Sequence, residues 1–316
     1  MRSDLNAIPV FVAVVECGNF AQAAEKLNVT RSAVGKSISR LEQRLGVALF
    51  QRTTRRQALT EEGEVFYLQS RRALDNLRDA ENEIQRGKTL VQGRLRISLP
   101  VLFGQRCVAP ILFPLSQRYP ELKLELSFSD RQVNLFEEGF DMAIRIGALS
   151  DSSFLKARRL GQHGMILCAS PLYLHNQPAP QTAEELHEHL TIGYLYAGQM
   201  QKWHLRDTHG AALAFRPQPG LAMDDFAAIA AAAKSGLGIA WLPDWLVADE
   251  IARGELQQIL PSSVSGSFAI SAVWPEAVWV PQKIRVVVDE LLARLPQQLA
   301  GGENQEDSSA SDRKST

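Results

Sequence analysis

Residues 20–46 read FAQAAEKLNVTRSAVGKSISRLEQRLG, and the spacing of their apolar residues decides the fold of the N-terminal part of the chain. Spacings of four and three put the first apolar residues on one face of a short helix; they are Phe20, Ala24 and Leu27. A break follows at Asn28-Val29, and Thr30 has the side chain to cap the next helix. In that helix the apolar residues recur every three or four positions until Gly46 ends it; they are Val34, Ile38, Leu41 and Leu45. The stretch therefore predicts two helices joined by a turn.

The helix predicted over residues 31–45 carries polar side chains opposite its apolar stripe. At about 100° per residue, one face of the helix collects four polar residues, Ser32, Lys36, Ser39 and Arg40. Arg31 lies in the first turn. Such a helix can dock on a domain by its apolar stripe while its cations and hydroxyls enter the major groove of DNA. An ordinary amphipathic helix with a solvated basic face has the same pattern, so this helix alone leaves both interpretations open.

The segment that follows adds positive charge. Residues 50–60 read FQRTTRRQALT, with three arginines interleaved with threonines: Arg52, Arg55 and Arg56. This composition suits a short wing that grips the phosphate backbone beside the groove. Residues 1–60 carry nine Lys or Arg against four acids, so their formal charge is +5, whereas the whole chain carries −1. The asymmetry favours a nucleic-acid-binding module joined to a different domain.

Residues 20–63, FAQAAEKLNVTRSAVGKSISRLEQRLGVALFQRTTRRQALTEEG, resemble the winged helix-turn-helix of LysR-type transcriptional regulators. The match is carried by AA in the first helix, SAV and RLE in the second, and the ending LG..LF.R.....LT..G. The resemblance implies a DNA-binding domain over residues 1–63. It places these residues at bases or phosphates: Thr30, Arg31, Ser32 and Lys36 on the helix, with Arg40 on the same face, and Arg52, Arg55 and Arg56 on the wing. Gly35 departs from the family's common Ser, which removes a hydroxyl and costs roughly 1 kcal/mol of helix stability against Ala.

One long helix is predicted after Gly63, ending at Gly87. Its apolar residues form a seam narrow enough for pairing with another helix; they are Phe66, Ala73, Leu77, Ala80 and Ile84. In the resembling family this linker helix, here residues 64–92, pairs two subunits and sets the spacing of their DNA-binding heads. Packing of the helix on its own chain is the alternative.

From Gly93 the apolar period changes to two, which predicts strands over residues 95–99 and 122–128 with a helix from Arg106 to Tyr119 between them. Further strands are predicted over 142–146, 166–169 and 239–242, and helices over 226–234 and 283–295. The fold class is therefore α/β, preceded by an all-α head.

This arrangement is similar to the LysR effector domain, which has the two-lobed architecture of periplasmic solute-binding proteins. The resemblance implies an effector-binding domain over residues 93–296, with lobe one at 93–161 and 268–296 and lobe two at 162–267. It is carried by RLRISLP, YPELKLELSF, EEGFDMAIRIG, ASPLYL and KSGLGIAWLP. Residues 297–316 contain few large apolar side chains and are expected to form a disordered tail.

In that architecture a small-molecule effector lies between the lobes, at strand ends and helix N-termini. The positions that match the family's cleft are Pro100, Val101, Leu102, Phe103, Ser129, Asp130, Arg145, Ile146, Gly147, Tyr196, Asp224 and Trp241. Arg145 is the candidate clamp for a carboxylate, because a guanidinium offers paired donors. Pairing of Arg145 with a native acid, Asp130 or Asp141, is the alternative.

Signatures of catalysis and metal binding are not found in the sequence. It has no GxSxG elbow, Walker loop or HExxH, and GLGIAW at residues 236–241 lacks the third glycine of a dinucleotide fingerprint. His187 and His189 point to different faces if they lie on a helix, so no metal site is expected. The cysteines, Cys17, Cys107 and Cys168, are far apart among apolar residues and predict buried reduced thiols. We therefore expect no cofactor and no enzymatic activity.

The leading hypothesis is a LysR-type regulator that binds an inverted-repeat promoter site and changes conformation when its effector binds. The expected partners are double-stranded DNA, the effector, further copies of the chain in a homodimer or homotetramer, and RNA polymerase if the protein is an activator. Cytoplasmic localisation is expected, because the N-terminus makes a poor signal peptide and no window reaches the roughly 20 apolar residues of a membrane span. A solute-binding carrier with a helical extension and an enzyme on the same scaffold remain as alternatives.

Overall fold

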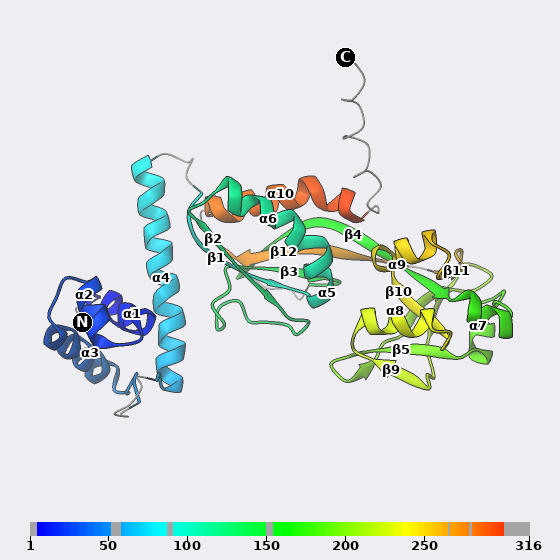
Figure 1. Ribbon diagram of the computed structural model, residues 1–316, viewed down its shortest axis with the longest axis horizontal. Helices are drawn as coiled ribbons and strands as arrows, with labels where there is room; N and C mark the ends of the chain where they lie inside the picture. The colour runs from blue at the N-terminus through cyan, green and yellow to red at the C-terminus, as the bar shows by residue number, and fades with distance from the viewer. Residues whose placement is uncertain are drawn as a thin grey trace, which may run out of the picture.

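The computed structural model describes residues 5–51, 58–86, 91–149, 154–264, 266–277 and 280–299. A helical head is followed by one long helix and then by an elongated α/β domain of two lobes (Figure 1). This order agrees with the expected fold class. In the described ranges no single helix is both long and apolar enough to cross a membrane. The helices α1 (Ala7–Cys17) and α2 (Phe20–Lys26) reach that length and hydropathy only when taken together, and the chain bends by 120° between them.

The head consists of α1 (Ala7–Cys17), α2 (Phe20–Lys26) and α3 (Arg31–Leu45). Each α3 residue of the predicted apolar stripe except Leu45 is buried, and these residues meet Phe11 and Val14 of α1 in one core. Thr30 caps α3 by accepting the Ala33 N–H at 3.1 Å, and Gly46 ends it with a φ of 75°. The two predicted helices and their ends are therefore confirmed.

The long helix α4 (Glu61–Arg86) begins before residue 64, where it was expected to start. Thr60 sets this start, because its hydroxyl accepts the Gly63 N–H at 3.0 Å and acts as a cap. The predicted seam is divided between two environments. Phe66 packs into the head core of its own chain, together with Tyr67 and Leu74, whereas Ala73 and Leu77 are exposed. Packing on its own chain is thus confirmed for Phe66, whereas pairing of the seam with another helix stays a prediction.

Lobe one contains β1 (Gly93–Leu99), β2 (Leu122–Phe128) and β3 (Met142–Ile146), with β1 between the other two in parallel register. A nearly continuous helical stretch follows β1 and begins at Val101 rather than Arg106; it comprises α5 (Val101–Phe103), the π-helical turn η1 (Gly104–Val108) and α6 (Ala109–Arg118). Together with α10 (Gln282–Leu299) it covers the buried residues of β1.

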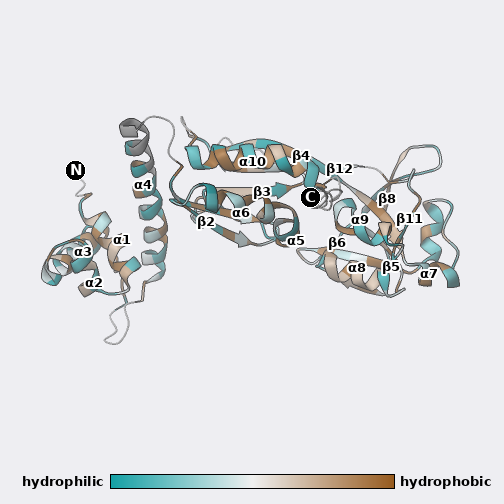
Figure 2. Ribbon diagram, turned by 45° about the horizontal axis from the view of Figure 1, so that its top comes forward, coloured by the Kyte–Doolittle hydropathy of each residue, from teal (hydrophilic) through white to brown (hydrophobic). Residues whose placement is uncertain are grey.

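Lobe two is built on β10 (Ile239–Pro243), β5 (Thr191–Tyr196), β9 (Leu221–Met223) and the short strands β6 (Gln199–Met200) and β11 (Gln257–Ile259). Its helices are α7 (Pro171–Asn176), η2 (Glu184–Glu188), α8 (Phe226–Lys234) and α9 (Asp244–Ala252). A separate hairpin pairs β7 (Trp203–Arg206) with β8 (Ala212–Phe215). Figure 2 shows α8 pale to brown, as its alanine-rich sequence requires, whereas α10 mixes apolar and polar residues.

Two long antiparallel strands connect the lobes, β4 (Leu155–Ala169) and β12 (Ser267–Pro275). β4 pairs with β12 as far as Gly164 and with β10 from Met165, so its change of lobe lies three residues beyond the expected boundary at 161. The C-terminal boundary also differs, because α10 continues to Leu299, whose side chain packs against the core of lobe one. Residues 300–316 of the expected tail lie outside the described residues.

Candidate DNA-binding face and inter-lobe cleft

The polar face of α3 is exposed. Thr30, Arg31, Ser32, Lys36 and Arg40 all lie on the surface of the head. In the part of the chain that the structure describes, no acidic side chain forms an ion pair with Arg31, Lys36 or Arg40. Their charges are therefore available to a partner, and the 15-residue helix that carries them can enter a major groove.

Glu42 attaches α3 to the segment that leads into the wing. Its carboxylate accepts the N–H groups of Leu49 at 2.7 Å and Phe50 at 3.2 Å. An antiparallel bridge between Phe50 and Leu59 then closes the base of the wing. The predicted wing arginines Arg52, Arg55 and Arg56 lie outside the described residues. Sequence reasoning noted Glu42 only as a letter of the RLE motif and missed this role.

Gly63 permits the close approach of α4 to the same segment. A Cβ atom at Gly63 would lie 2.1 Å from the backbone oxygen of Leu49, a distance that no side chain can occupy. Thr60 adds a second connection, because its hydroxyl donates to the Ala48 carbonyl at 2.7 Å. The base of the wing, α3 and α4 are thus held as one unit.

A cleft of about 680 Å³ lies between the lobes. All but one of the predicted effector-site residues line it; they are Pro100, Leu102, Phe103, Ser129, Asp130, Arg145, Ile146, Gly147, Tyr196, Asp224 and Trp241. Val101 does not line the cleft. Instead, its backbone N–H donates to Asp130 Oδ1 at 2.9 Å and starts the helical stretch after β1.

Arg145 is partly buried in the cleft wall. Its guanidinium donates to the Ile144 carbonyl at 2.9 Å and approaches Ser98 Oγ at 3.4 Å. Burial lowers the pKa of Arg145 from its ordinary value, against the opposing effects of Tyr196 and Glu138. The expected native partners are engaged elsewhere, because Asp130 accepts the Val101 N–H and Asp141 accepts the Arg96 N–H at 2.7 Å.

No carboxylate within the described ranges therefore forms an ion pair with Arg145. Taking a guanidinium out of water costs free energy that an anion bound beside it would recover. The wall around Arg145 is thus suited to the anionic end of a small molecule.

Aromatic rings form the part of the cleft near the connecting strands. His163 stacks on Phe268 with ring centres 5.6 Å apart, and Trp245 contacts both His163 and Phe103 edge-on at 6.4 and 5.4 Å. Burial lowers the pKa of His163, which favours the neutral form of this ring. Sequence reasoning missed His163, Trp245 and Phe268, because the pairing of β4 with β12 brings His163 to Phe268 and the packing of α9 adds Trp245.

A pair of tyrosines lies on the lobe-two side of the cleft. Burial raises the pKa of Tyr194 to about 12, and its ring stacks on Phe226 with centres 4.0 Å apart. The hydroxyl of Tyr196 donates to the Asp130 carbonyl of lobe one at 3.2 Å. This hydrogen bond crosses the cleft.

Thiol and metal chemistry have little support in the described ranges. There, the three cysteines are free, and no group of three or more His, Cys, Asp or Glu residues is arranged to hold a metal ion. Burial raises the pKa of both Cys107 and Cys168 to about 12, which keeps these thiols protonated and unreactive.

Two family models match most of the chain. The family model for the LysR substrate binding domain matches residues 88–296, and the model for the bacterial regulatory helix-turn-helix protein, lysR family, matches residues 5–64. The HTH-type transcriptional regulator CrgA of Neisseria meningitidis serogroup C is 35% identical over 302 residues, which are 95% of this chain and 100% of CrgA.

Solved structures support the same assignment. The structure of CrgA from Neisseria meningitidis has a TM-score of 0.59 and 33% identity, covering 92% of this chain and 98% of that one. The full-length structure of AphB, the Vibrio cholerae virulence activator, has a TM-score of 0.58 and 29% identity, and the match covers 92% of this chain and 99% of AphB. These relatives are transcriptional regulators and not enzymes. With both family models matched and a relative of this identity over its full length, the chain belongs to the LysR family of transcriptional regulators.

Proposed function

We propose that the protein binds an inverted-repeat promoter site through residues 1–63 and controls transcription in response to a small anionic effector bound between its lobes. The observation that carries the proposal is the pair of cation sites that form no ion pair with an acid among the described residues, one on α3 and one at Arg145 in the cleft. The first suits phosphates and guanine edges, and the second suits a carboxylate. The protein would act in the cytoplasm, where its DNA is.

On α3, Arg31 and Lys36 are the strongest candidates for base and phosphate contacts, with Thr30, Ser32 and Arg40 beside them. The exposed residues Val65, Ala73 and Leu77 of α4 support pairing with a second copy, because Val65 and Leu77 are 57% and 61% exposed. Two paired heads would match the two half-sites of an inverted repeat. A tetramer would join two such pairs, and an activator would also contact RNA polymerase.

Selection of bound fragments from a random double-stranded DNA pool tests the first part of the proposal. The affinity for the selected DNA is then measured across a range of salt concentrations for the parent, Arg31→Ala and Lys36→Ala. Each substitution should weaken binding, and loss of a phosphate contact should reduce the salt slope by about 0.9. Lys123→Ala is the matched control, because Lys123 is an exposed cation on β2 outside the head. Equal effects of all three substitutions would refute a DNA-reading role for α3.

A thermal-shift screen of small carboxylates, with their neutral amides beside them, tests the second part. A carboxylate that binds the folded protein at 100 times its Kd should stabilise it by about 2.7 kcal/mol. Arg145→Met should abolish that shift, while the amide should give little shift with either protein. A carboxylate that stabilises Arg145→Met as well as the parent would exclude Arg145 as the clamp.

A further inference from the structure

The segment of residues 129–141 connects β2 to β3 and lies between the cleft and α4. Its first part lines the cleft with Ser129, Asp130, Gln132, Val133 and Leu135. Its second part contacts α4, where Gln69 Nε2 donates to the Phe136 carbonyl at 2.6 Å and the Arg72 guanidinium lies 5.0 Å from the centre of the Phe136 ring. The same short segment therefore touches both functional parts of the molecule.

Hydrogen bonds within the segment make it a rigid body. Asn134 Oδ1 accepts the Phe136 N–H at 3.0 Å, and the Glu138 carboxylate accepts the Asn134 N–H at 2.9 Å while pairing with Arg131. The buried side chains of Leu135 and Phe140 share a small core with Ala143 and Val273. A displacement at the cleft end should therefore reach Phe136 with little loss.

The cleft end of the segment is held by both lobes. Asp130 Oδ1 accepts the Val101 N–H of lobe one, and the Asp130 carbonyl accepts the Tyr196 hydroxyl of lobe two at 3.2 Å. A change in the separation of the lobes must stretch or release this second bond. Asp130 is thus a point of lobe one that such a change affects directly.

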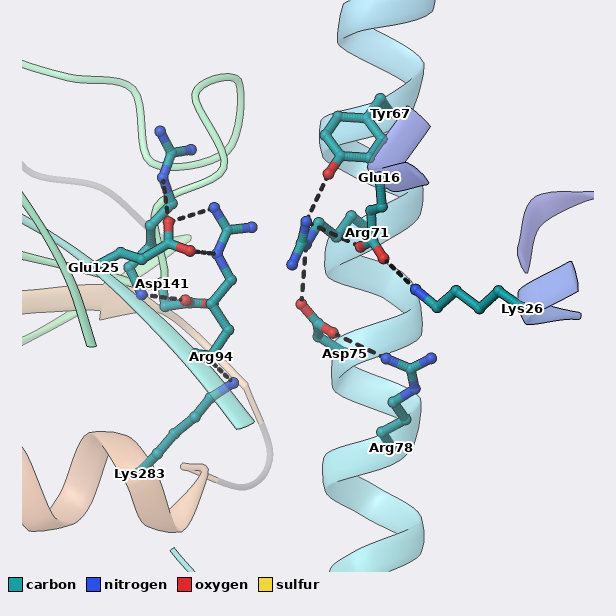
Figure 3. Close-up of polar contacts among 11 residues, drawn as sticks. Glu16, Lys26, Tyr67, Arg71, Asp75, Arg78, Arg94, Glu125, Asp141 and Lys283 are labelled. Atoms are coloured by element: carbon teal, nitrogen blue, oxygen red, sulfur yellow. Dashed lines mark hydrogen bonds and ion pairs between the residues drawn. The ribbon is translucent and has the colours of Figure 1, made fainter. Parts of the chain in front are cut away.

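The other side of α4 is fixed to the head by charged groups (Figure 3). Arg71 pairs with Glu16 of α1 at 3.0 Å, and Glu16 pairs with Lys26 of α2 at 3.1 Å. Arg71 also donates to the Tyr67 hydroxyl at 2.6 Å. Because Phe66, Tyr67 and Leu74 also pack into the head core, α4 and the DNA-binding head move together.

Figure 3 also shows the face of lobe one opposite α4. There Lys283 donates to the Arg94 carbonyl at 2.7 Å, and Arg94 pairs with Glu125. Burial raises the pKa of Asp75, which faces this cluster from α4, against the opposing charges of Lys283 and Arg71. In addition to this charged face, α4 contacts the 129–141 segment directly, because Gln69 and Arg72 both contact Phe136.

We propose that the 129–141 segment couples the inter-lobe cleft to α4, with Phe136 as the positioning residue at its outer end. The inference rests on the proposed function, because it describes how occupancy of the effector cleft changes the arrangement of the DNA-binding heads. Lobe closure acts through Tyr196 on Asp130, the segment moves as one body, and Phe136 shifts α4 through Gln69 and Arg72.

The test fixes the lobes chemically and so needs no identified effector. The full-length protein carries Cys17→Ser, Gln132→Cys and Lys202→Cys, which place exposed thiols on the two lobes at the cleft. Bismaleimides of graded length hold the lobes at graded separations. Fluorescence anisotropy then gives the affinity for the DNA selected in the experiment above. The same cross-links are made in Gln69→Ala/Phe136→Ala and in Phe136→Tyr, and far-UV circular dichroism checks that each variant, including its helical head, is folded.

At least one cross-linker should change the DNA affinity of the parent by about 5-fold or more, and this change should fall below about 2-fold in the double variant. Phe136→Tyr should keep it, because the ring under Arg72 and the carbonyl bound to Gln69 remain. An equal change in the double variant, or no change in the parent at any cross-linker length, would overturn the coupling. Absence of DNA binding before cross-linking would refute the proposed function itself.

Discussion

Replacement of Gly35 by Ala should make the DNA-binding head more stable. Gly35 lies in the interior of α3, and apart from its chain neighbours and the adjacent helix backbone no described atom lies within 4 Å of the position that a Cβ atom would take. Its φ is not positive, so an L-residue fits without strain. The substitution therefore removes the flexibility of glycine from the unfolded chain and adds no clash.

The expected gain is about 1 kcal/mol, the difference between Gly and Ala in a helix interior. That is roughly a 5-fold change in the folding equilibrium, or about 4–8 °C in Tm for a unit the size of the head and α4. Gly35→Ser should gain less, because Ser is a weaker helix former than Ala. It also supplies the hydroxyl that the family commonly has at this position.

The assay must report on the head alone. All five tryptophans lie between residues 203 and 279, so their fluorescence follows only the effector-binding domain. Hydrogen exchange of the α1–α3 amides, read by mass spectrometry, should slow about 5-fold in Gly35→Ala under conditions where exchange follows the opening equilibrium. Faster exchange in α3 would refute the reasoning. Slower exchange with weaker DNA binding would show that DNA approaches the backbone at Gly35.

Two further predictions concern ionisation. Burial alone would raise the pKa of Glu125, but its hydrogen bond and charge interaction with Arg94 outweigh burial and lower the pKa. This pair therefore contributes stability above the ordinary pKa of 4.5 and loses it as the pH falls through the folded-state pKa. Glu125→Gln should lower the free energy of unfolding at pH 7, by less than about 1 kcal/mol because the site is partly exposed. In strong acid the variant should match the parent, which urea unfolding at several pH values checks. Iodoacetamide at pH 8 should modify Cys17 in the native protein but not Cys107 or Cys168, because these two thiols are buried and their pKa values are about 12. In urea, mass spectrometry should find all three cysteines modified. Labelling of Cys107 or Cys168 without urea would contradict this account.

Elements with a strong local signal could be predicted from the sequence almost residue by residue. Thr30 and Gly46 mark the ends of α3, and both act there through their own chemistry, a hydroxyl cap and a positive φ. The strand over residues 142–146 and the helix over 226–234 have the predicted bounds. In these cases neighbouring residues suffice to determine the element.

Features that depend on distant partners could not be predicted in this way. In the sequence, the apolar residues of α4 recur with one helical period along the whole seam. In the structure, Phe66 packs on its own head while Leu77 stays exposed, because the head covers only one end of the helix. The helical stretch after β1 begins at Val101 because the Asp130 carboxylate accepts the Val101 N–H. That bond joins residues 29 positions apart, and no local pattern reveals it.

The same distinction applies to the effector site. Resemblance to the family located Arg145, Tyr196 and Trp241 at the cleft, but it left open whether Arg145 pairs with a native acid. Among the described residues neither acid forms an ion pair with Arg145, and each carboxylate instead accepts a backbone N–H, that of Val101 for Asp130 and that of Arg96 for Asp141. Which charges pair in the folded chain thus depends on contacts between distant residues.

These engaged carboxylates have a consequence for regulation. Asp130 holds the start of the helix after β1 with its side chain and receives Tyr196 from lobe two with its carbonyl, and within the described residues it forms no ion pair with Arg145. If the cleft binds an anionic effector as proposed, that anion gains most when the lobes exclude water around it. A ligand shifts a conformational equilibrium only by its difference in affinity for the two states. Under the proposed function, the partly buried Arg145 would supply such a difference, because closing the lobes over an empty Arg145 would cost free energy that closing them over a bound carboxylate would recover.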